Sequence, residues 1–247
     1  MEPMVSIVIP TYNEENFLPK LLHSIRKQEY KNKEVIVADA NSTDKTKEIA
    51  IQHGAKLIDG GLPAQGRNNG AKKAKGDIIL FLDADVVLPD AYFLQFIIKE
   101  FERKKLAIAT CLPLPLSSKK IDHVFHNFYN VYSKILEAMM PHTPGFCILV
   151  KKSLHETLNG FDEEIKLAED HDYAQRAAEF GKFGILRSRK IPVSIRRFQK
   201  DGHLRIAAKY LFCELHMMAI GPVKSDIFNY KFGFGKDFNQ EPIKKIK

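Results

Sequence analysis

Cysteine is scarce in this sequence of 247 residues, and long apolar runs are missing from it. The three cysteines, Cys111, Cys147 and Cys213, are widely spaced and odd in number, which favours reduced thiols over a disulfide framework or a zinc site. No stretch reaches the roughly 18 consecutive apolar residues of a membrane span, because the best candidate, residues 210–221, is interrupted by polar side chains such as Glu214. A signal-peptide pattern is also missing. We therefore expect a cytoplasmic protein that does not span a membrane.

The composition predicts a globular protein with an anionic partner. Hydrophobic residues make up 45% of the chain and charged residues 28%, without low-complexity tracts, which argues against disorder. The formal net charge of +8 fits a nucleic acid, a phosphorylated substrate or a membrane surface. The sequence has no basic–aromatic strand, zinc-ligand spacing or helix-turn-helix pattern, so a nucleic-acid partner is not expected.

Apolar runs alternate with amphipathic segments over the first hundred residues. Strands are predicted at 5–9, 35–38, 56–58 and 77–82, and helices after Asn13, after Ser42 or Asp44, and over 64–75. Repeated strand–helix units of this length predict a parallel sheet with helices on both faces. In such sheets ligands bind beyond the carboxyl ends of the strands. The polar groups that follow these strands are 10–12, Asp39 and 83–85.

The second half follows a different pattern. Residues 112–116 are predicted to be a proline-punctuated linker, followed by a long amphipathic helix whose apolar face packs in the core. That face comprises Phe125, Phe128, Tyr132 and Ile135. A further strand is predicted at 146–150 and a turn at 159–162, which together favour a single α/β domain.

Two carboxylates, those of Asp83 and Asp85, come directly after the apolar run of the 77–82 strand. Residues two apart at a strand end point to the same side, so both carboxylates can reach one small volume. Their charges repel unless a cation or an array of donors lies between them, and hard oxygen ligands without a nearby Cys or His pair suit Mg²⁺ or Mn²⁺. The alternative is a strand-end turn, in which Asp is common. From these residues alone both interpretations stay open.

Six short motifs occur over about residues 4–180. They are VSIVIPTYNE at 5–14, EVIVADANSTD at 34–44, GRNNG at 66–70, DAD at 83–85, GFDE at 160–163 and AEDHD at 168–172. In their order and spacing they resemble the family 2 glycosyltransferases, which have the GT-A fold, a mixed and mainly parallel central sheet with helices on both faces. The resemblance implies one domain over 1–247, with a donor-binding half at 1–111 and an acceptor-binding half with C-terminal helices at 112–247. Ala40 departs from the pattern, because many members carry a second acid there, and the Q-x-x-R-W motif of processive members is not present.

The resemblance implies an enzyme that moves a sugar from a nucleoside diphosphate sugar to an unidentified hydroxyl acceptor, a glycan or a lipid phosphate. A UDP-sugar is the first expectation for the donor and GDP-mannose the second. Mg²⁺ or Mn²⁺ on Asp85, assisted by Asp83, would neutralise charge on the leaving diphosphate, and Asp83 would also bind the ribose. Arg67 would reach the same region, with a solvated helix charge as its alternative.

Five positions are implied at the nucleoside end of the donor. Asp39 would accept a hydrogen bond from a uracil or guanine N–H. Tyr12 would stack on the base, and Pro10 and Thr11 would supply backbone contacts. Glu14 would lie near the base or ribose, and its alternative is a first-turn acid that favours the helix dipole.

Asp170 is implied as the general base that takes a proton from the acceptor hydroxyl, so that one displacement inverts the anomeric configuration. Glu169 and Asp172 are the alternatives, and Asp172 also suits a helix cap. His203 and His216 would either complete the metal site or be structural, and the structural role is preferred.

Two other functions and one surface stay open. A nucleotidyltransferase characteristically places a Gly-rich loop with Arg after the first strand, and residues 10–14 contain neither. A non-catalytic sugar-nucleotide binder would not need an acid at position 170. Basic residues around the apolar run 210–213 would suit peripheral contact with the inner membrane face, but an amphipathic helix that closes the core is the preferred interpretation.

Overall fold

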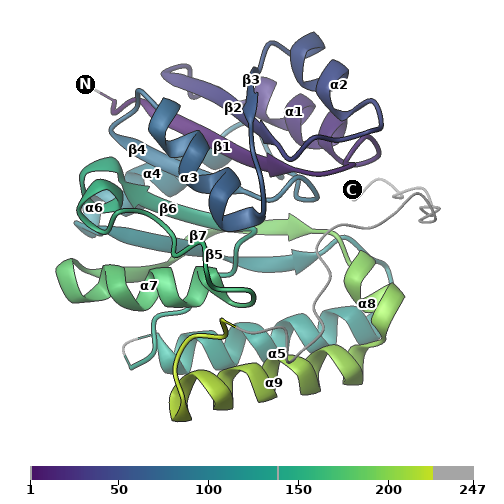
Figure 1. Ribbon diagram of the computed structural model, residues 1–247, viewed down its shortest axis with the longest axis vertical. Helices are drawn as coiled ribbons and strands as arrows, with labels where there is room; N and C mark the ends of the chain where they lie inside the picture. The colour runs from purple at the N-terminus through teal and green to yellow at the C-terminus, as the bar shows by residue number, and fades with distance from the viewer. Residues whose placement is uncertain (1, 138, 225–247) are drawn as a thin grey trace.

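The computed structural model describes residues 2–137 and 139–224 (Figure 1). Its strands are β1 (Val5–Thr11), β2 (Lys33–Asp39), β3 (Lys56–Asp59), β4 (Ile78–Leu82), β5 (Ile108–Pro115), β6 (Cys147–Lys151) and β7 (Phe183–Val193). Its helices are α1 (Leu18–Arg26), α2 (Thr46–Gln52), α3 (Pro63–Lys73), α4 (Phe93–Arg103), α5 (Lys120–Leu136), α6 (Lys152–Thr157), α7 (Glu169–Phe180), α8 (Arg196–Asp201) and α9 (His203–Ala219). All five strands predicted from the sequence are present, as β1 to β4 and β6. Residues 225–247 of the expected acceptor-binding half lie outside the described residues.

One seven-stranded sheet contains strands from both halves of the chain, in the order β3-β2-β1-β4-β6-β5-β7. Strands β3, β2, β1 and β4 pair in parallel, and β5 pairs in parallel with β7. Only β6, among the described strands, runs antiparallel to both of its neighbours, β4 and β5. The expected mixed and mainly parallel sheet is therefore confirmed.

Helices cover both faces of this sheet (Figure 1). Neighbouring residues of a strand point to opposite faces, so Ile7 belongs to the core under α1 and α4, and Val8 to the core under α3 and α7. Leu21 of α1 lies in the first core and Tyr173 of α7 in the second, both fully buried. The β1–β4 region, with its carboxyl ends at one edge, is thus held from both sides.

The predicted linker at 112–116 is wrong, because residues up to Pro115 belong to β5 and pair with β7. Strand β6 accompanies β5 only as far as Thr110. Beyond that point one side of β5 has no strand neighbour in the described part of the chain, so the missing N–H groups of Pro113 and Pro115 interrupt no ladder. Pro113 and Pro115 therefore lie within a strand and do not mark a linker.

The predicted core face of α5 is wrong for two of its four residues, whereas Phe125 and Tyr132 are half-buried. Phe128 is 73% exposed and Ile135 70% exposed. The buried side of α5 is polar and comprises Asp122, His126, Asn130 and Ser133. One reason is the open side of β5, where Asn130 Nδ2 donates to the Pro113 carbonyl at 3.1 Å. Another is Asp122, whose Oδ1 lies 2.6 Å from His203 Nε2 of α9.

The helix α9 lies beside α5 at the end of the molecule away from α1 and α2 (Figure 1). Its buried residues Ile206 and Cys213 partly confirm the expected core-closing helix, but Leu211, Phe212 and other apolar residues of the same helix are exposed. Among the described residues, no helix is long and apolar enough to cross a membrane.

Candidate active site

Asp39 ends β2 in a buried pocket of hydrogen-bond donors. Its Oδ2 accepts hydrogen bonds from Thr11 Oγ1 at 2.9 Å and from Ser42 Oγ at 2.6 Å, and its Oδ1 accepts one from Ser42 N at 2.8 Å. Thr11 is directly opposite Asp39 in the register of β1 and β2. These bonds fix the carboxylate at the carboxyl edge of the sheet, where the sequence predicts a ligand.

The loops after β1 and β2 hold each other in place. Asn13 N donates to Ser42 Oγ at 2.8 Å, and Thr43 N donates to Asn13 Oδ1 at 2.9 Å. Asn13 has a left-handed backbone with φ of 54°, a conformation that Asn tolerates better than most residues. Tyr12 lies between these anchors in the chain, and its side chain is 45% exposed, so its ring is accessible to a ligand.

Glu14, Asp85 and Arg196 form a buried ion cluster. Arg196 Nη1 and Nη2 bond Glu14 Oε2 and Oε1 at 2.8 and 2.9 Å, and Arg196 Nε lies 2.8 Å from Asp85 Oδ2. Burial raises the pKa of Glu14 to about 7, although Arg196 acts in the opposite direction. Burial also raises the pKa of Asp85, against the same guanidinium. The two acids therefore depend on a cation between them.

Arg67 lies between the carboxylates of β4 and α7. Its Nη2 lies 3.0 Å from Asp83 Oδ1 and its Nη1 lies 2.8 Å from Glu169 Oε1. The side chain is 3% exposed and its guanidinium carbon lies 5.4 Å from the centre of the Phe161 ring. The alternative of a solvated helix charge is therefore wrong, and Arg67 joins Asp83, which follows β4, to Glu169 at the start of α7.

Asp170 lies in the first turn of α7 and is held by backbone donors. Its Oδ2 accepts a hydrogen bond from Gly145 N at 2.5 Å, and its Oδ1 accepts one from His171 N at 2.9 Å. Burial raises the pKa of Asp170, while the nearby Arg67 lowers it. A partly buried carboxylate with a raised pKa is a better proton acceptor than one in water.

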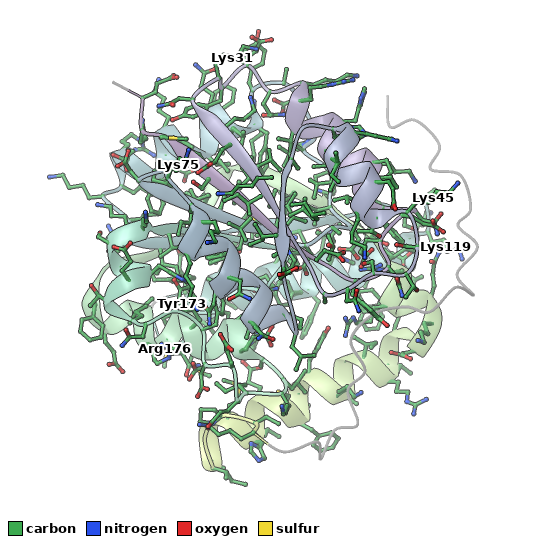
Figure 2. All side chains as sticks on the ribbon, turned by 45° about the horizontal axis from the view of Figure 1, so that its top comes forward. Lys31, Lys45, Lys75, Lys119, Tyr173 and Arg176 are labelled. Atoms are coloured by element: carbon green, nitrogen blue, oxygen red, sulfur yellow. The ribbon has the colours of Figure 1, made fainter. Side chains whose placement is uncertain are left out.

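The other two acids of the same motif are occupied by arginines. Glu169 forms an ion pair with Arg67. Asp172 Oδ2 accepts a hydrogen bond from Arg176 Nε at 2.8 Å, and Arg176 Nη2 donates to the Gly160 carbonyl at 3.1 Å. Figure 2 labels Arg176 beside Tyr173 on α7, and the Arg176 guanidinium carbon lies 5.8 Å from the centre of that ring. Arg176, oriented by Asp172, therefore tethers the 160–163 turn to α7.

The two acids that follow β4 suit a divalent cation. Mg²⁺ and Mn²⁺ are commonly held by one or two carboxylates together with substrate phosphates, and Asp83 and Asp85 supply such oxygens. The buried Asp85 already has a positive partner in Arg196, which shows that this position accommodates positive charge. Two carboxylates at this position are a donor set that fits a divalent cation shared with a substrate phosphate. Within the described residues, no group of three or more His, Cys, Asp and Glu side chains is arranged as a metal site.

The two candidate histidines contact other groups. His203 Nε2 lies 2.6 Å from Asp122 Oδ1, and its ring stacks on Phe198 with 5.0 Å between centres. His216 Nδ1 lies 3.1 Å from the Gly221 carbonyl. These contacts favour the structural role that the sequence analysis prefers.

Sequence reasoning did not place Arg196 or Gly145 in the site. Arg196 follows β7, whose end lies beside the acids because Ser194 N donates to the Asp85 carbonyl at 3.0 Å. No local pattern marks this residue, whose partner Glu14 is 182 positions away. Gly145 lies so close to Arg67 Nη2 that a Cβ built on it would be 2.4 Å away, and a glycine before the 146–150 strand was its only signal.

Comparisons with known proteins agree with this arrangement. The family described as Glycosyl transferase family 2 matches residues 6–158. An uncharacterized glycosyltransferase of Rickettsia typhi is 30% identical over 186 residues, which cover 69% of this chain and 57% of the relative. This chain belongs to glycosyl transferase family 2. It spans little more than half the length of that relative.

Two solved structures show the same fold. The mannosyltransferase PcManGT from Pyrobaculum calidifontis, in complex with GDP-Man and Mn²⁺, is 23% identical with a TM-score of 0.65, over 86% of this chain and 65% of that chain. TarS 1-349 of S. aureus, in complex with UDP-GlcNAc, is 21% identical with a TM-score of 0.60, over 77% of this chain and 58% of that chain. The fold is therefore the GT-A fold that the motifs predict.

Proposed function

We propose that this chain is a glycosyltransferase that moves a sugar from a nucleoside diphosphate sugar to a hydroxyl acceptor, with inversion at the anomeric carbon. The observation that carries the proposal is the division of the carboxylates around Arg67. Asp83 approaches from β4 on one side, and Glu169 and its neighbour Asp170 approach from α7 on the other. Donor and acceptor chemistry thus have separate acids within one site.

The nucleoside of the donor binds at Asp39 and Tyr12. An ionised carboxylate has about four acceptor positions, and the pocket uses three of them, so one is left for an N–H of uracil or guanine. Pro10 and Thr11 line the same strand end. A UDP-sugar remains the first candidate and GDP-mannose the second, and the UDP-GlcNAc and GDP-Man complexes of the two structural neighbours support both.

The diphosphate binds between Asp85 and Arg67. Mg²⁺ or Mn²⁺ on Asp85, with Asp83, would act as a Lewis acid for the leaving diphosphate, and the Mn²⁺ in the PcManGT complex supports this choice. Arg67 orients Asp83 through its ion pair and adds positive charge near the leaving group. Arg196 holds Glu14 and Asp85 in place before the donor enters.

Asp170 acts as the general base. Glu169 and Asp172 are each paired with an arginine, whereas the hydrogen bonds that Asp170 accepts come from backbone N–H groups. Asp170 therefore takes the proton from the acceptor hydroxyl as that hydroxyl attacks the anomeric carbon. The acceptor class is a glycan or a lipid phosphate, and a cytoplasmic location with peripheral contact at the inner membrane face stays a prediction.

Asp170→Asn tests this assignment against Asp172→Asn as its control. Thermal unfolding with UDP or GDP, with and without Mn²⁺, measures donor-site binding, because a ligand of the folded state raises the Tm. We expect both variants to keep the nucleotide shift, but only Asp170→Asn to lose transfer, by about 10²- to 10⁴-fold. Unchanged turnover in Asp170→Asn would contradict the base assignment.

The nucleotide-containing product distinguishes a glycosyltransferase from a nucleotidyltransferase and from a non-catalytic sugar-nucleotide binder. Incubation with UDP-sugars and GDP-mannose should release UDP or GDP. A nucleotidyltransferase would instead make or consume pyrophosphate, and a non-catalytic binder would show the thermal shift without any release. Either result would overturn the proposed function.

A further inference from the structure

The outer side of the α5–α9 pair is apolar over most of its length. On α5 the exposed large apolar side chains are Ile121, Val124, Phe128, Val131 and Ile135, and on α9 they are Leu204, Leu211, Phe212 and Leu215. We call these nine residues the outer apolar face. The α5 members recur at intervals of three and four residues, which places them along one stripe of the helix.

This arrangement is the reverse of an ordinary surface helix. An amphipathic helix normally turns its apolar stripe to the core and its polar side to water, but α5 buries Asp122, His126 and Asn130 and exposes Phe128. Single exposed apolar residues are common and need no explanation. Nine of them lie on two adjacent helices, and clusters of exposed apolar residues mark interaction surfaces.

Polar contacts fix the inner side of the pair, and the described residues leave the outer side exposed. Near the start of both helices His203 bonds Asp122, and further along Tyr132 bonds Glu214. The two helices therefore run in the same direction, side by side, as Figure 1 shows at one end of the molecule. No described residue from another element covers Phe128 enough to reduce its exposure below 73%.

Among the residues of α5 and α9, basic side chains border the outer apolar face and acids do not. Lys120 precedes Val124 by four residues and Lys134 follows Val131 by three, so each lies on the α5 surface next to the stripe. On α9 the exposed Arg205 has the corresponding position. The only acids within the two helices are Asp122, which is 1% exposed, and Glu214, which is paired with His142. The exposed surface of the pair is thus apolar and cationic.

We propose that the outer apolar face docks on the surface of an anionic lipid bilayer. The apolar side chains enter the boundary between headgroups and acyl chains, and Lys120, Lys134 and Arg205 meet the lipid phosphates. Charge selects the bilayer over a second copy of the chain, because self-association through this face would bring exposed lysines and arginines together without acids between them. The helices lie on the membrane and do not span it.

Vesicle co-sedimentation of the full chain tests the proposal without any sugar transfer. We expect binding to vesicles of equal parts phosphatidylcholine and phosphatidylglycerol, and weaker binding to phosphatidylcholine alone or at high salt. Phe128→Ser should reduce the partition coefficient about tenfold, and Lys134→Gln about fivefold. The control Ile51→Ser changes a 62% exposed residue of α2 and should bind like the parent chain.

Three results would overturn the proposal. The first is failure of the parent chain to sediment with anionic vesicles. The second is a dimer by light scattering that Phe128→Ser dissociates, which would assign the face to a second copy. The third is a Tm lowered by several degrees in Phe128→Ser together with unchanged vesicle binding, which would mean that the chain itself covers the face. The proposal is supported if vesicle binding weakens in Phe128→Ser and in Lys134→Gln while the Tm of each stays unchanged.

Discussion

Replacement of Arg67 by Met should destabilise the protein strongly, because it leaves acids buried without a counter-charge. Arg67 is 3% exposed and makes two ion pairs, with Glu169 at 2.8 Å and Asp83 at 3.0 Å. Met has a similar reach but no charge, so the cavity stays filled. Glu169 is 6% exposed and would remain as an unpaired buried carboxylate.

The expected magnitude follows from the burial of the pair. Removal of one partner of a buried ion pair costs about 3–5 kcal/mol, which corresponds to a loss of roughly 6–20 °C in Tm for a chain of this size. The double variant Arg67→Met/Glu169→Gln removes the charge from both partners. It should recover about 2 kcal/mol of this loss, because neighbouring sites in one ion pair are not additive.

Thermal and urea unfolding followed by circular dichroism measure these differences. Arg187→Met is the matched control, because Arg187 pairs with Glu137 at 2.7 Å but its side chain is 57% exposed. We expect that variant to lose less than about 1 kcal/mol. Equal small losses in Arg67→Met and Arg187→Met, with no coupling in the double variant, would refute the buried role of Arg67.

Three further predictions concern the same site. Burial raises the pKa of Glu14 from 4.5 to about 7, so the folded state binds this proton more tightly than the unfolded chain. The free energy of unfolding should therefore fall as pH rises from 4.5 to 7, by no more than about 3 kcal/mol. Urea titrations of Glu14→Gln should lack that fall. Arg196→Gln removes the cation beside Asp85, so Mn²⁺ should bind roughly tenfold more tightly without nucleotide, as measured by electron paramagnetic resonance, and weaker binding would contradict this competition. Gly145→Ala places a Cβ 2.4 Å from Arg67 Nη2 and should lower the Tm by about 2–12 °C, whereas an unchanged Tm would show that Arg67 can move aside.

The parallel half of the fold was predictable because its signals are local. Strand β4 is an uninterrupted apolar run buried on both faces, and such runs are typical of parallel sheets. Asp39 ends β2, and Asp83 and Asp85 follow β4; both strands pair in parallel with β1, so their carboxyl ends lie at one edge of the sheet. Strand periodicity was therefore sufficient to place these acids at that edge.

The second half was less predictable because its contacts are distant in sequence. The apolar stripe of α5 has helical spacing whether it faces the core or not, and the partners of its polar side, such as His203 and the Pro113 carbonyl, come from other elements. Arg196 bonds Glu14 across a separation of 182 positions in the chain. Periodicity shows that a helix has an apolar and a polar face, but it does not show which of them the other elements bury.

The stereochemistry of the transfer product tests the central claim most directly. We propose Asp170 as the base on the acceptor side and Asp83 and Asp85 as the acids of the donor side, a division that suffices for one in-line displacement. Proton NMR of the first product formed from an α-linked donor sugar should show a β-linked product. An α-linked product would require a second displacement or a different attack geometry, and would contradict the account even if every donor-site residue proved correct.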